Sequence, residues 1–343
     1  MKELGSFLLE TIESQSAVAA RLLADTDLVR EAARQLSIGS RVYLIGTGTS
    51  FHGCLAGEHM LRSIGVDARA VLSFEFASYP PAARDGDVLI ILSHRGTKRF
   101  TIDAAGGSRV AARILITGQG SPMTAGTTLR TVEQERSPVH TASHIGAMVR
   151  LAQLVAEVSP ESDVARHLAG LPAAVGSAVG TGGLCAEVAA GLNLGRPLLY
   201  AGAGPGWASA MEGALKVREA AFVTAEAQEL ENLLHGPLIS IDQSDTVFLI
   251  AQPGPSLERT REAAAALAEI GTTVVAVGPA SRSVPSAAWA IQTPELPEAL
   301  APIVNVIPLQ WIAYHASRAR QVDADSFRRD DPRYLAAQAR FTL

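Results

Sequence analysis

The amino-acid sequence predicts an α/β protein of two tandem units, each a doubly wound parallel sheet flanked by helices. Short apolar runs that suit buried strands alternate with stretches of helical periodicity. Glycine-rich turns follow two of these runs, and the second half repeats landmarks of the first. An almost constant offset indicates the duplication of a unit of roughly 160 residues. The landmarks, at offsets of 156, 158 and 160 residues, are Gly48 and Gly204, Asp87 and Asp245, and Gly118 and Gly278.

The predicted domain boundary falls at the polar stretch 159–163, which contains Pro160. We expect an N-terminal domain with a leading helix at residues 1–160 and a C-terminal domain at residues 161–321, followed by a tail at residues 322–343. A chain of 343 residues is long enough for two cores of ordinary size.

In the first half, apolar periodicity predicts a helix over residues 3–36 that ends at the breaker Ser37-Ile-Gly-Ser40. A buried parallel strand is expected at 41–45. A glycine loop follows at 46–50, and then a helix from Phe51 to about Ser63.

Two further strands, at 87–92 and 113–117, and a helix at about 143–158 complete the first unit. In the second unit, a strand at 198–201 leads into the glycine loop 202–206 and then into a helix. Ligands of such sheets bind at the carboxyl ends of the strands, so we expect a site in the loops that follow them. The alternative is a pair of dinucleotide-binding domains, but neither glycine loop has the third glycine of GxGxxG.

Composition and charge exclude several classes of protein. The chain is 48% hydrophobic and 18% charged, which is typical of a globular protein. Its net charge of −5 argues against a nucleic-acid partner. Cys54 and Cys185 lack the spacing of metal ligands, so we expect no metal and no cofactor. The N-terminus has no signal-peptide pattern, and no apolar run reaches the roughly 18 residues of a membrane span. We therefore expect a cytoplasmic protein with no membrane partner.

The helix after the second glycine loop carries three charged residues on one face. Glu212, Lys216 and Glu219 are four and three residues apart, so helical spacing brings them together. The preceding loop and the free N–H groups of the helix start suit an anion such as phosphate. Lys216 is one of only three lysines among 29 basic residues, and lysine is the cation whose pKa shifts readily on burial. The alternative is a solvated ion pair on a surface helix.

Several motifs in the sequence resemble those of the sugar isomerase (SIS) family. The motifs are Gly46-Thr-Gly-Thr-Ser50, Glu212-Gly-Ala-Leu-Lys-Val-Arg-Glu219, Ala225-Glu-Ala227 and His235-Gly-Pro237. The resemblance is to two tandem SIS units, as in the isomerase half of glutamine–fructose-6-phosphate aminotransferase, and it covers essentially the whole chain. Because the chain begins at the isomerase part, we expect no glutaminase domain before it.

The resemblance implies roles for individual residues. Glu219 would move a proton between C1 and C2 of the open-chain sugar, with Lys216 beside it near the substrate oxygens. His235 would assist ring opening from the neighbouring subunit, which implies a homodimer; the alternative for His235 is a structural cap before Gly-Pro. A carboxylate base and an imidazole suit these steps chemically. The residues expected to hold the phosphate and sugar hydroxyls are Gly48, Thr49, Ser50, Ser93, His94, Arg95, Gly96, Thr97, Lys98 and Ser143.

The sequence departs from the family pattern at several of these positions. Arg95 and Lys98 stand where the second loop usually has Ser and Thr. Two cations could grip a phosphate harder, suit a substrate with an extra carboxylate, or pair with acidic residues and block the site. Asn232 replaces a Glu and His144 replaces a common Lys. Ala337 stands where the aminotransferase has a functional tail Lys, so we do not expect the glutamine-dependent reaction.

These observations predict a phosphosugar aldose–ketose isomerase that acts on a hexose or hexosamine 6-phosphate by proton transfer between C1 and C2. One alternative is a deaminase or deglycase for an amino-sugar 6-phosphate or an Amadori adduct. The other is a non-catalytic protein that senses a sugar phosphate. Glu219 and His235 favour an enzyme, since a sensor needs neither a base nor a ring opener.

Overall fold

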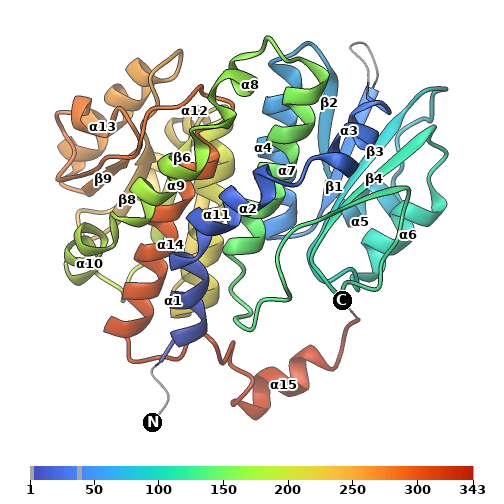
Figure 1. Cartoon of the computed structure of the whole chain (residues 1–343). Coiled ribbons are helices and arrows are strands. Elements are labelled where there is room, and N and C mark those ends of the chain that lie inside the picture. Colours follow the sequence, from blue (N-terminus) through green and yellow to red (C-terminus); the bar gives the residue numbers. More distant parts are fainter. Residues whose placement is uncertain (1–3, 37–40, 343) are drawn as a thin grey trace. The chain divides into compact units, whose positions relative to one another are not determined.

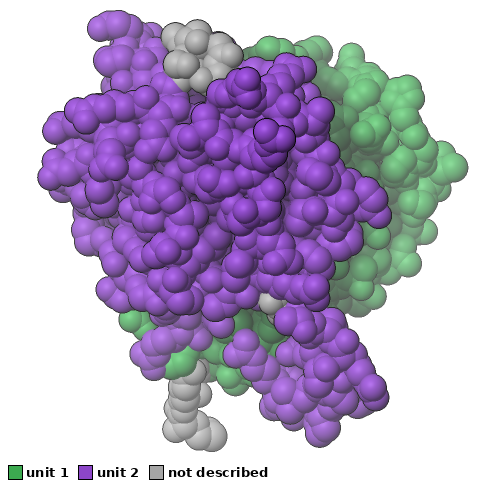
Figure 2. All heavy atoms as spheres, turned by 90° about the vertical axis from the view of Figure 1, so that its right-hand side faces the viewer, with its two compact units in different colours: residues 1–13, 137–139, 173–327 green, residues 14–136, 140–172, 328–343 purple. Residues whose placement is uncertain are grey.

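The computed structural model describes residues 4–36 and 41–342 (Figure 1). The expected breaker at 37–40 lies outside the described residues. The chain forms two compact units, coloured separately in Figure 2. Unit 1 comprises residues 1–13, 137–139 and 173–327, and unit 2 comprises residues 14–136, 140–172 and 328–343. The domain limits expected at 160 and 321 stay a prediction. The two units are compact groups of contacting residues, and they place residues 1–13 with the second half of the chain and residues 328–343 with the first.

Unit 2 is built on a five-stranded parallel sheet in the order β2-β1-β3-β4-β5. The strands β1, β3 and β4 are buried and apolar, as expected of a parallel sheet that is covered on both faces. All three strands predicted for this half are present within about one residue. The full set is β1 Arg41–Gly46, β2 Asp67–Leu72, β3 Val88–Ser93, β4 Ala112–Thr117 and β5 Thr127–Arg130.

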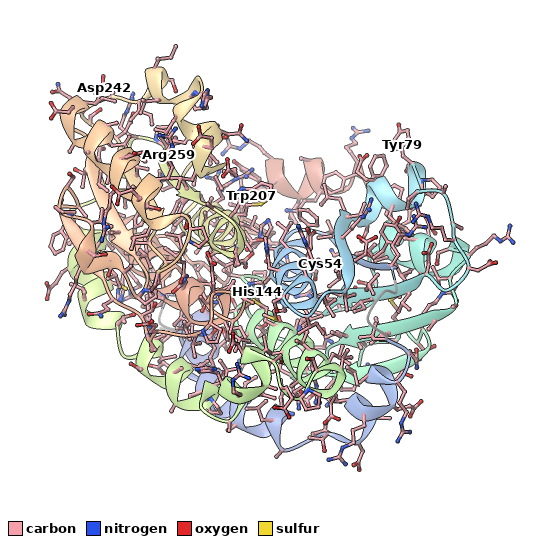
Figure 3. All side chains as sticks on the ribbon, turned by 90° about the horizontal axis from the view of Figure 1, so that it is seen from above. Cys54, Tyr79, His144, Trp207, Asp242 and Arg259 are labelled. Carbon is pink, nitrogen blue, oxygen red and sulfur yellow. The ribbon has the colours of Figure 1, made fainter. Side chains whose placement is uncertain are left out.

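The helices of unit 2 include the two that were predicted, α4 (Thr49–Arg62) and α7 (Ala142–Val158), which pack on each other. Figure 3 labels one residue of each, Cys54 on α4 and His144 on α7. The remaining helices assigned to unit 2 are α2 Gln15–Leu23, α3 Asp27–Ala33, α5 Ser73–Ser78, α6 Arg99–Gly107, α8 Asp163–Leu168 and α15 Pro332–Gln338.

The single helix predicted over residues 3–36 is wrong. The chain instead forms α1 (Ser6–Glu13), which belongs to unit 1, and then α2 and α3. The turn between α2 and α3 has a buried partner: Arg150 of α7, only 2% exposed, donates to the carbonyl oxygens of Leu22 and Asp25 and pairs with the Asp25 carboxylate at 2.5 Å. Carbonyls at a helix end need such partners, and this guanidinium supplies them.

Unit 1 contains a second five-stranded parallel sheet, in the order β10-β9-β8-β6-β7. Taken from β7 to β10, this is the same succession of strands as in unit 2. The long helix α11 (Pro205–Ala221) follows β6 and packs against α14 (Pro302–Ala319). The strands are β6 Leu198–Gly202, β7 Ala225–Glu229, β8 Thr246–Ile250, β9 Thr273–Val277 and β10 Trp289–Ile291. The other helices are α9 Leu171–Val179, which begins two residues before this unit, α10 Gly182–Ala190, α12 Leu230–Leu234 and α13 Leu257–Ile270, with short 3₁₀ turns at Pro237–Ser240 and Ser281–Ser283.

The repeated landmarks have matching local structure in the two units. Gly48 and Gly204 each precede a long helix. Their φ angles are +57° and +51°, a backbone conformation that favours glycine. Asp87 accepts a hydrogen bond of 2.8 Å from Nε of Arg41, the first residue of β1. Asp245 accepts one of the same length from Nε of Arg196, two residues before β6. They also each accept one from a backbone N–H three residues earlier, again at 2.8 Å.

One stretch of the described chain is long and apolar enough to cross a membrane, contrary to our expectation. It is Leu171–Ala190, with a mean hydropathy of 1.3, and 28% of its apolar window is buried. It corresponds to α9, a break at residues 180–181, and α10. One such stretch is weak evidence for a membrane span, because length and composition alone also select helices of soluble proteins.

Candidate active site

A pocket lies at the carboxyl ends of the unit 2 strands, where a parallel sheet is expected to bind its ligand. Its empty space is about 350 Å³, part of which is open to solvent. Hydroxyl and imidazole side chains line one part of it, and Leu92, Ile116 and Ala147 line the rest. The residues named from the sequence that line this pocket are Thr49, Ser50, Ser93, His94 and Ser143.

Thr49 and Ser50 reach the pocket from the first turn of α4. Gly48, with its positive φ, ends the loop there, and it has no side chain that could cap the helix. The first turn of this 14-residue helix and two hydroxyl residues therefore lie at the pocket. This arrangement is a ready-made site for an anion such as a phosphate group.

Only part of the loop at residues 93–98, which follows β3, lines the pocket. Ser93 and His94 line the pocket, while Arg95, Gly96, Thr97 and Lys98 do not. Gly96 is required by packing, because a Cβ atom there would lie 2.0 Å from Ser121 Oγ and the φ is +66°. Gly48 is likewise near the pocket without lining it.

Arg95 and Lys98 have no ion pair or hydrogen bond from their side chains among the described residues. Partial burial lowers the pKa of Lys98, and the nearby charges of Arg95 and Arg329 lower it further. Two cations that repel each other and have no acidic partner favour an anionic ligand. This is evidence against a loop closed by internal ion pairs.

The sequence motifs missed Thr117, Thr131 and His140, which also line the pocket, and His144 was noted only as a departure. Thr117 and Thr131 are held by their own hydrogen bonds: Thr117 Oγ1 donates to the Ser93 carbonyl at 2.6 Å, and Thr131 Oγ1 donates to the Thr117 carbonyl at 3.1 Å. No spacing rule connects these residues, because they come from strand ends and from the irregular segment before α7.

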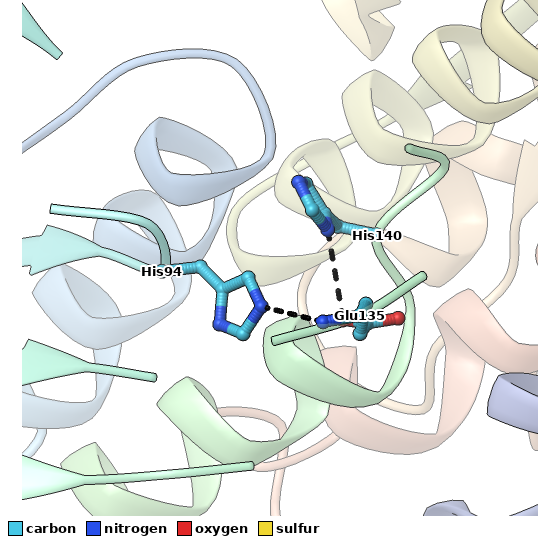
Figure 4. A group of neighbouring side chains, drawn as sticks. All are labelled: His94, Glu135 and His140. Atoms are coloured by element: carbon cyan, nitrogen blue, oxygen red, sulfur yellow. Dashed lines mark hydrogen bonds and ion pairs between the residues drawn. The ribbon is translucent and has the colours of Figure 1, made fainter. Parts of the chain in front are cut away.

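Behind the pocket, the Glu135 carboxylate lies between two histidines, His94 and His140 (Figure 4). The Glu135 N–H donates to His94 Nε2 at 3.2 Å, and His140 Nδ1 lies 3.8 Å from Glu135 Oε1. Burial lowers the pKa of His94 to about 4, so this ring is neutral at physiological pH. Burial alone would raise the pKa of Glu135, but His140, the Ser143 side chain and the charge of His94 outweigh it and lower that pKa to about 2. Glu135 is therefore a buried, ionised carboxylate.

The predicted charged face of α11 exists in unit 1. Lys216 Nζ lies 2.5 Å from Glu219 Oε2 and 3.3 Å from Glu212 Oε1. Lys216 and Glu212 are fully buried, whereas the Glu219 side chain is 19% exposed. Burial favours the neutral form of Lys216, but its pKa is raised, because the charges of Glu212 and Glu219 outweigh that effect. The alternative of a solvated surface pair is therefore wrong.

His235 lies elsewhere on unit 1, at the end of α12. Its side chain is 70% exposed, and Nε2 bonds to Glu231 at 2.8 Å. Glu231 in turn pairs with Arg259, which Figure 3 labels. The Asn232 backbone N–H bonds to Glu229, and Ala337 lies within α15. Within one chain, His235 thus has a surface position rather than a place beside Lys216.

The comparisons with known proteins bear on the second half of the chain most directly. A family model described as the SIS domain matches residues 196–319, which contain α11 and all five strands of the unit 1 sheet. Residues 196–319 are a SIS domain. The charged face of α11 and His235 both lie in this SIS domain.

Relatives extend the similarity beyond the SIS domain. A glutamine–fructose-6-phosphate aminotransferase [isomerizing] of Zymomonas mobilis is 27% identical in an alignment 328 positions long, which covers 88% of this chain and 52% of the relative. The chain spans about half the length of the curated relatives it matches.

Solved structures share the fold over nearly the whole chain. One is the C-terminal domain of glucosamine-fructose-6-phosphate aminotransferase from Francisella tularensis, with a TM-score of 0.81, 18% identity and coverage of 93% of this chain and 98% of that one. Another is tagatose-6-phosphate ketose/aldose isomerase from Escherichia coli, with a TM-score of 0.81, 20% identity and coverage of 94% and 95%. At such identities the likeness concerns the fold.

Proposed function

We propose that this chain is a phosphosugar aldose–ketose isomerase that acts on a hexose or hexosamine 6-phosphate without glutamine. The observation that carries the proposal is the α11 triad of Glu212, Lys216 and Glu219. The Glu219 carboxylate is partly exposed to solvent and lies 2.5 Å from the buried ammonium group of Lys216. Lys216 fixes the position of the Glu219 carboxylate, and an oriented carboxylate is what a proton-transferring base requires.

The proposed reaction moves one proton between two carbons. Glu219 removes the proton on C2 of the open-chain aldose, O1 gains a proton, and a C1=C2 enediol forms. Glu219 then returns its proton to C1 while O2 loses one and becomes the carbonyl oxygen of the ketose. Electrons and protons balance without a redox partner. Lys216, next to Glu219, stabilises negative charge that develops on the sugar oxygens during these steps.

The unit 2 pocket supports the choice of a phosphorylated substrate. Six hydroxyl side chains line it: those of Thr49 and Ser50 at the start of α4, and those of Ser93, Thr117, Thr131 and Ser143. We further propose that unit 2 is itself a SIS domain, so that the chain carries two in tandem. The same strand order in both sheets and the matching geometry at Gly48 and Gly204 support this duplication.

A substrate panel tests the proposed function. The native protein is mixed with hexose and hexosamine 6-phosphates, and ketose formation and ammonia release are measured in parallel. We expect aldose–ketose interconversion of at least one member. Ammonia release without isomerisation would replace the isomerase with a deaminase. Binding without either reaction would replace it with a sensor of sugar phosphates.

Changing Lys98 to Thr or Arg95 to Ser is expected to weaken phosphosugar binding by about tenfold and to make it less sensitive to salt. A charge-assisted contact to phosphate is worth about 1.5–3 kcal/mol, and exposure to solvent reduces this value. Calorimetric titration with glucose 6-phosphate and fructose 6-phosphate measures the change. Arg99→Ala is the matched control, since Arg99 pairs with Asp103 and is mostly exposed. Tighter binding in both loop variants would mean that the two cations obstruct the site.

We propose that the protein is a homodimer in which His235 serves the partner's site. The exposed ring of His235 and the surface position of α12 support this proposal, and two-fold assemblies are the most common ones. Light scattering at micromolar concentration is expected to give twice the mass of one chain. A mass of 35.9 kDa, that of one chain, would contradict it.

A further inference from the structure

The cluster of Glu135, His94 and His140 could act in two ways, as a metal site or as a proton-transferring pair. One ligand atom from each residue lies within 4.8 Å of the others, which is compatible with a cation. A metal-binding imidazole nitrogen must offer its lone pair. The lone pair of His94 Nε2 already accepts the N–H of Glu135 at 3.2 Å, which leaves the proton of this neutral ring on Nδ1. His94 Nδ1 is buried without a hydrogen-bond partner, so with its proton there neither nitrogen of this ring offers a lone pair to a metal, and the metal set loses one of its three ligands.

The geometry suits the second role, with His140 as the active group. The Glu135 carboxylate is fixed by the N–H groups of Thr141 and Ser143, at 3.1 and 2.8 Å, at the start of α7. His140 turns Nδ1 toward this carboxylate, and that nitrogen is buried without a hydrogen-bond partner. Of the two ring nitrogens, only Nδ1 is buried without a partner. The His140 ring is 23% exposed and lines the pocket. A small rotation would close the 3.8 Å gap, and such contacts often tighten when a ligand binds.

We propose that Glu135 and His140 form a carboxylate–imidazole pair in which His140 opens the ring of a phosphosugar bound in the unit 2 pocket, while Glu135 positions the imidazole. This inference rests on the proposed function. It assigns ring opening to a residue of the chain that binds the phosphate, whereas the family resemblance assigns it to His235.

The chemistry of ring opening fits one imidazole beside a phosphate site. The C1–O5 bond breaks, O1 loses its proton and becomes a carbonyl oxygen, and O5 gains a proton and becomes a hydroxyl. One proton leaves and one arrives, so His140 can pass it from O1 to O5. The carbon that carries O5 is next to the carbon that carries the phosphate, so a side chain in the phosphate pocket is close to O5. The buried charge of Glu135 stabilises the imidazolium that forms in between.

The test measures ring opening separately from isomerisation. Interconversion of the α and β anomers of glucose 6-phosphate needs ring opening only, and exchange NMR follows it. His140→Asn is expected to slow this interconversion by about 10²–10⁴-fold. Binding of glucitol 6-phosphate, which is acyclic and needs no opening, should stay within about threefold of the native affinity. His167→Asn is the control, because His167 lies on the surface of the same unit and bonds to the Asp163 carbonyl.

Glu135→Gln tests the positioning role. Thermal unfolding first checks that the variant is folded, since Glu135 also holds the start of α7. A positioning role predicts a fall in kcat with KM nearly unchanged, and a merely structural role would change kcat only as far as the fold is lost. If the variant is unfolded, the His140→Asn results decide alone.

The outcomes separate this inference from the proposed function. Anomer interconversion by the native protein without isomerisation, lost in His140→Asn, supports the inference and overturns the isomerase. Isomerisation that is unchanged in His140→Asn overturns the inference alone, as does loss of anomer interconversion in His235→Asn but not in His140→Asn. One equivalent of zinc in the purified native protein that is missing from His140→Asn would show a metal site instead and would also overturn it.

Discussion

Changing Glu219 to Gln is expected to lower turnover by about 10²–10⁴-fold, because general-base catalysis is typically worth that much. Glutamine keeps the shape of the side chain and an oxygen that accepts from Lys216, which lies 2.5 Å away in the native protein. The change removes the proton acceptor and one of the two negative charges beside Lys216, while Glu212, 3.3 Å from Lys216 Nζ, remains its partner. Binding of the phosphosugar should therefore stay within about tenfold of the native affinity.

Glu226→Gln is the matched control for this prediction. Glu226 is an exposed glutamate of β7 in the same SIS domain, so its change removes one negative charge without touching the α11 triad. Steady-state kinetics and calorimetry on both variants give kcat, KM and affinity. Native turnover in Glu219→Gln would remove Glu219 as the base.

Changing Lys216 to Met is expected to cost about 3–5 kcal/mol of stability, the usual effect of removing one partner of a buried ion pair. Glu212 is fully buried and lies 3.3 Å from Lys216 Nζ. Without this cation its carboxylate must remain charged in an apolar surrounding or take up a proton. The loss should therefore be greatest at neutral pH and smaller in acid, where protonation removes the buried charge.

The double variant Lys216→Met with Glu212→Gln is the informative control, because it removes both charges. It should recover much of the lost stability, since replacing both members of a buried pair costs less than breaking it. Arg166→Ala, which affects the exposed pair with Asp163, should change stability by less than about 1 kcal/mol. Urea unfolding measures all three. A Lys216→Met variant as stable as the native protein would contradict the described burial of the triad.

The sequence allowed the charged face of α11 to be predicted because helical spacing alone brings its three residues together. It did not reveal that Glu212 and Lys216 are buried. Their burial depends on how closely α14 packs on α11, where a Cβ atom on Gly213 would lie 2.7 Å from Leu309. Such packing joins residues almost one hundred positions apart, and local periodicity carries no information about it.

The same limit explains the other differences. The strands before the glycine loops were predictable, since buried parallel strands are continuous apolar runs. The division of the N-terminal helix depends on Arg150, more than 100 residues further along the chain. Glu135 and His140 belong to an irregular segment without a recognisable motif, so their place behind the pocket required the three-dimensional structure.

Turnover in heavy water tests the central proposal most directly. The native protein is incubated in D₂O with the sugar phosphate that it converts, and NMR follows the protons on C1 and C2. A proton shuttled by Glu219 exchanges with solvent while it is on the carboxyl group, so deuterium should appear at C2 of the aldose and C1 of the ketose. Glu219→Gln should stop this exchange. Conversion with no deuterium in either sugar over many turnovers, or binding with no conversion of any member of the panel, would contradict the account.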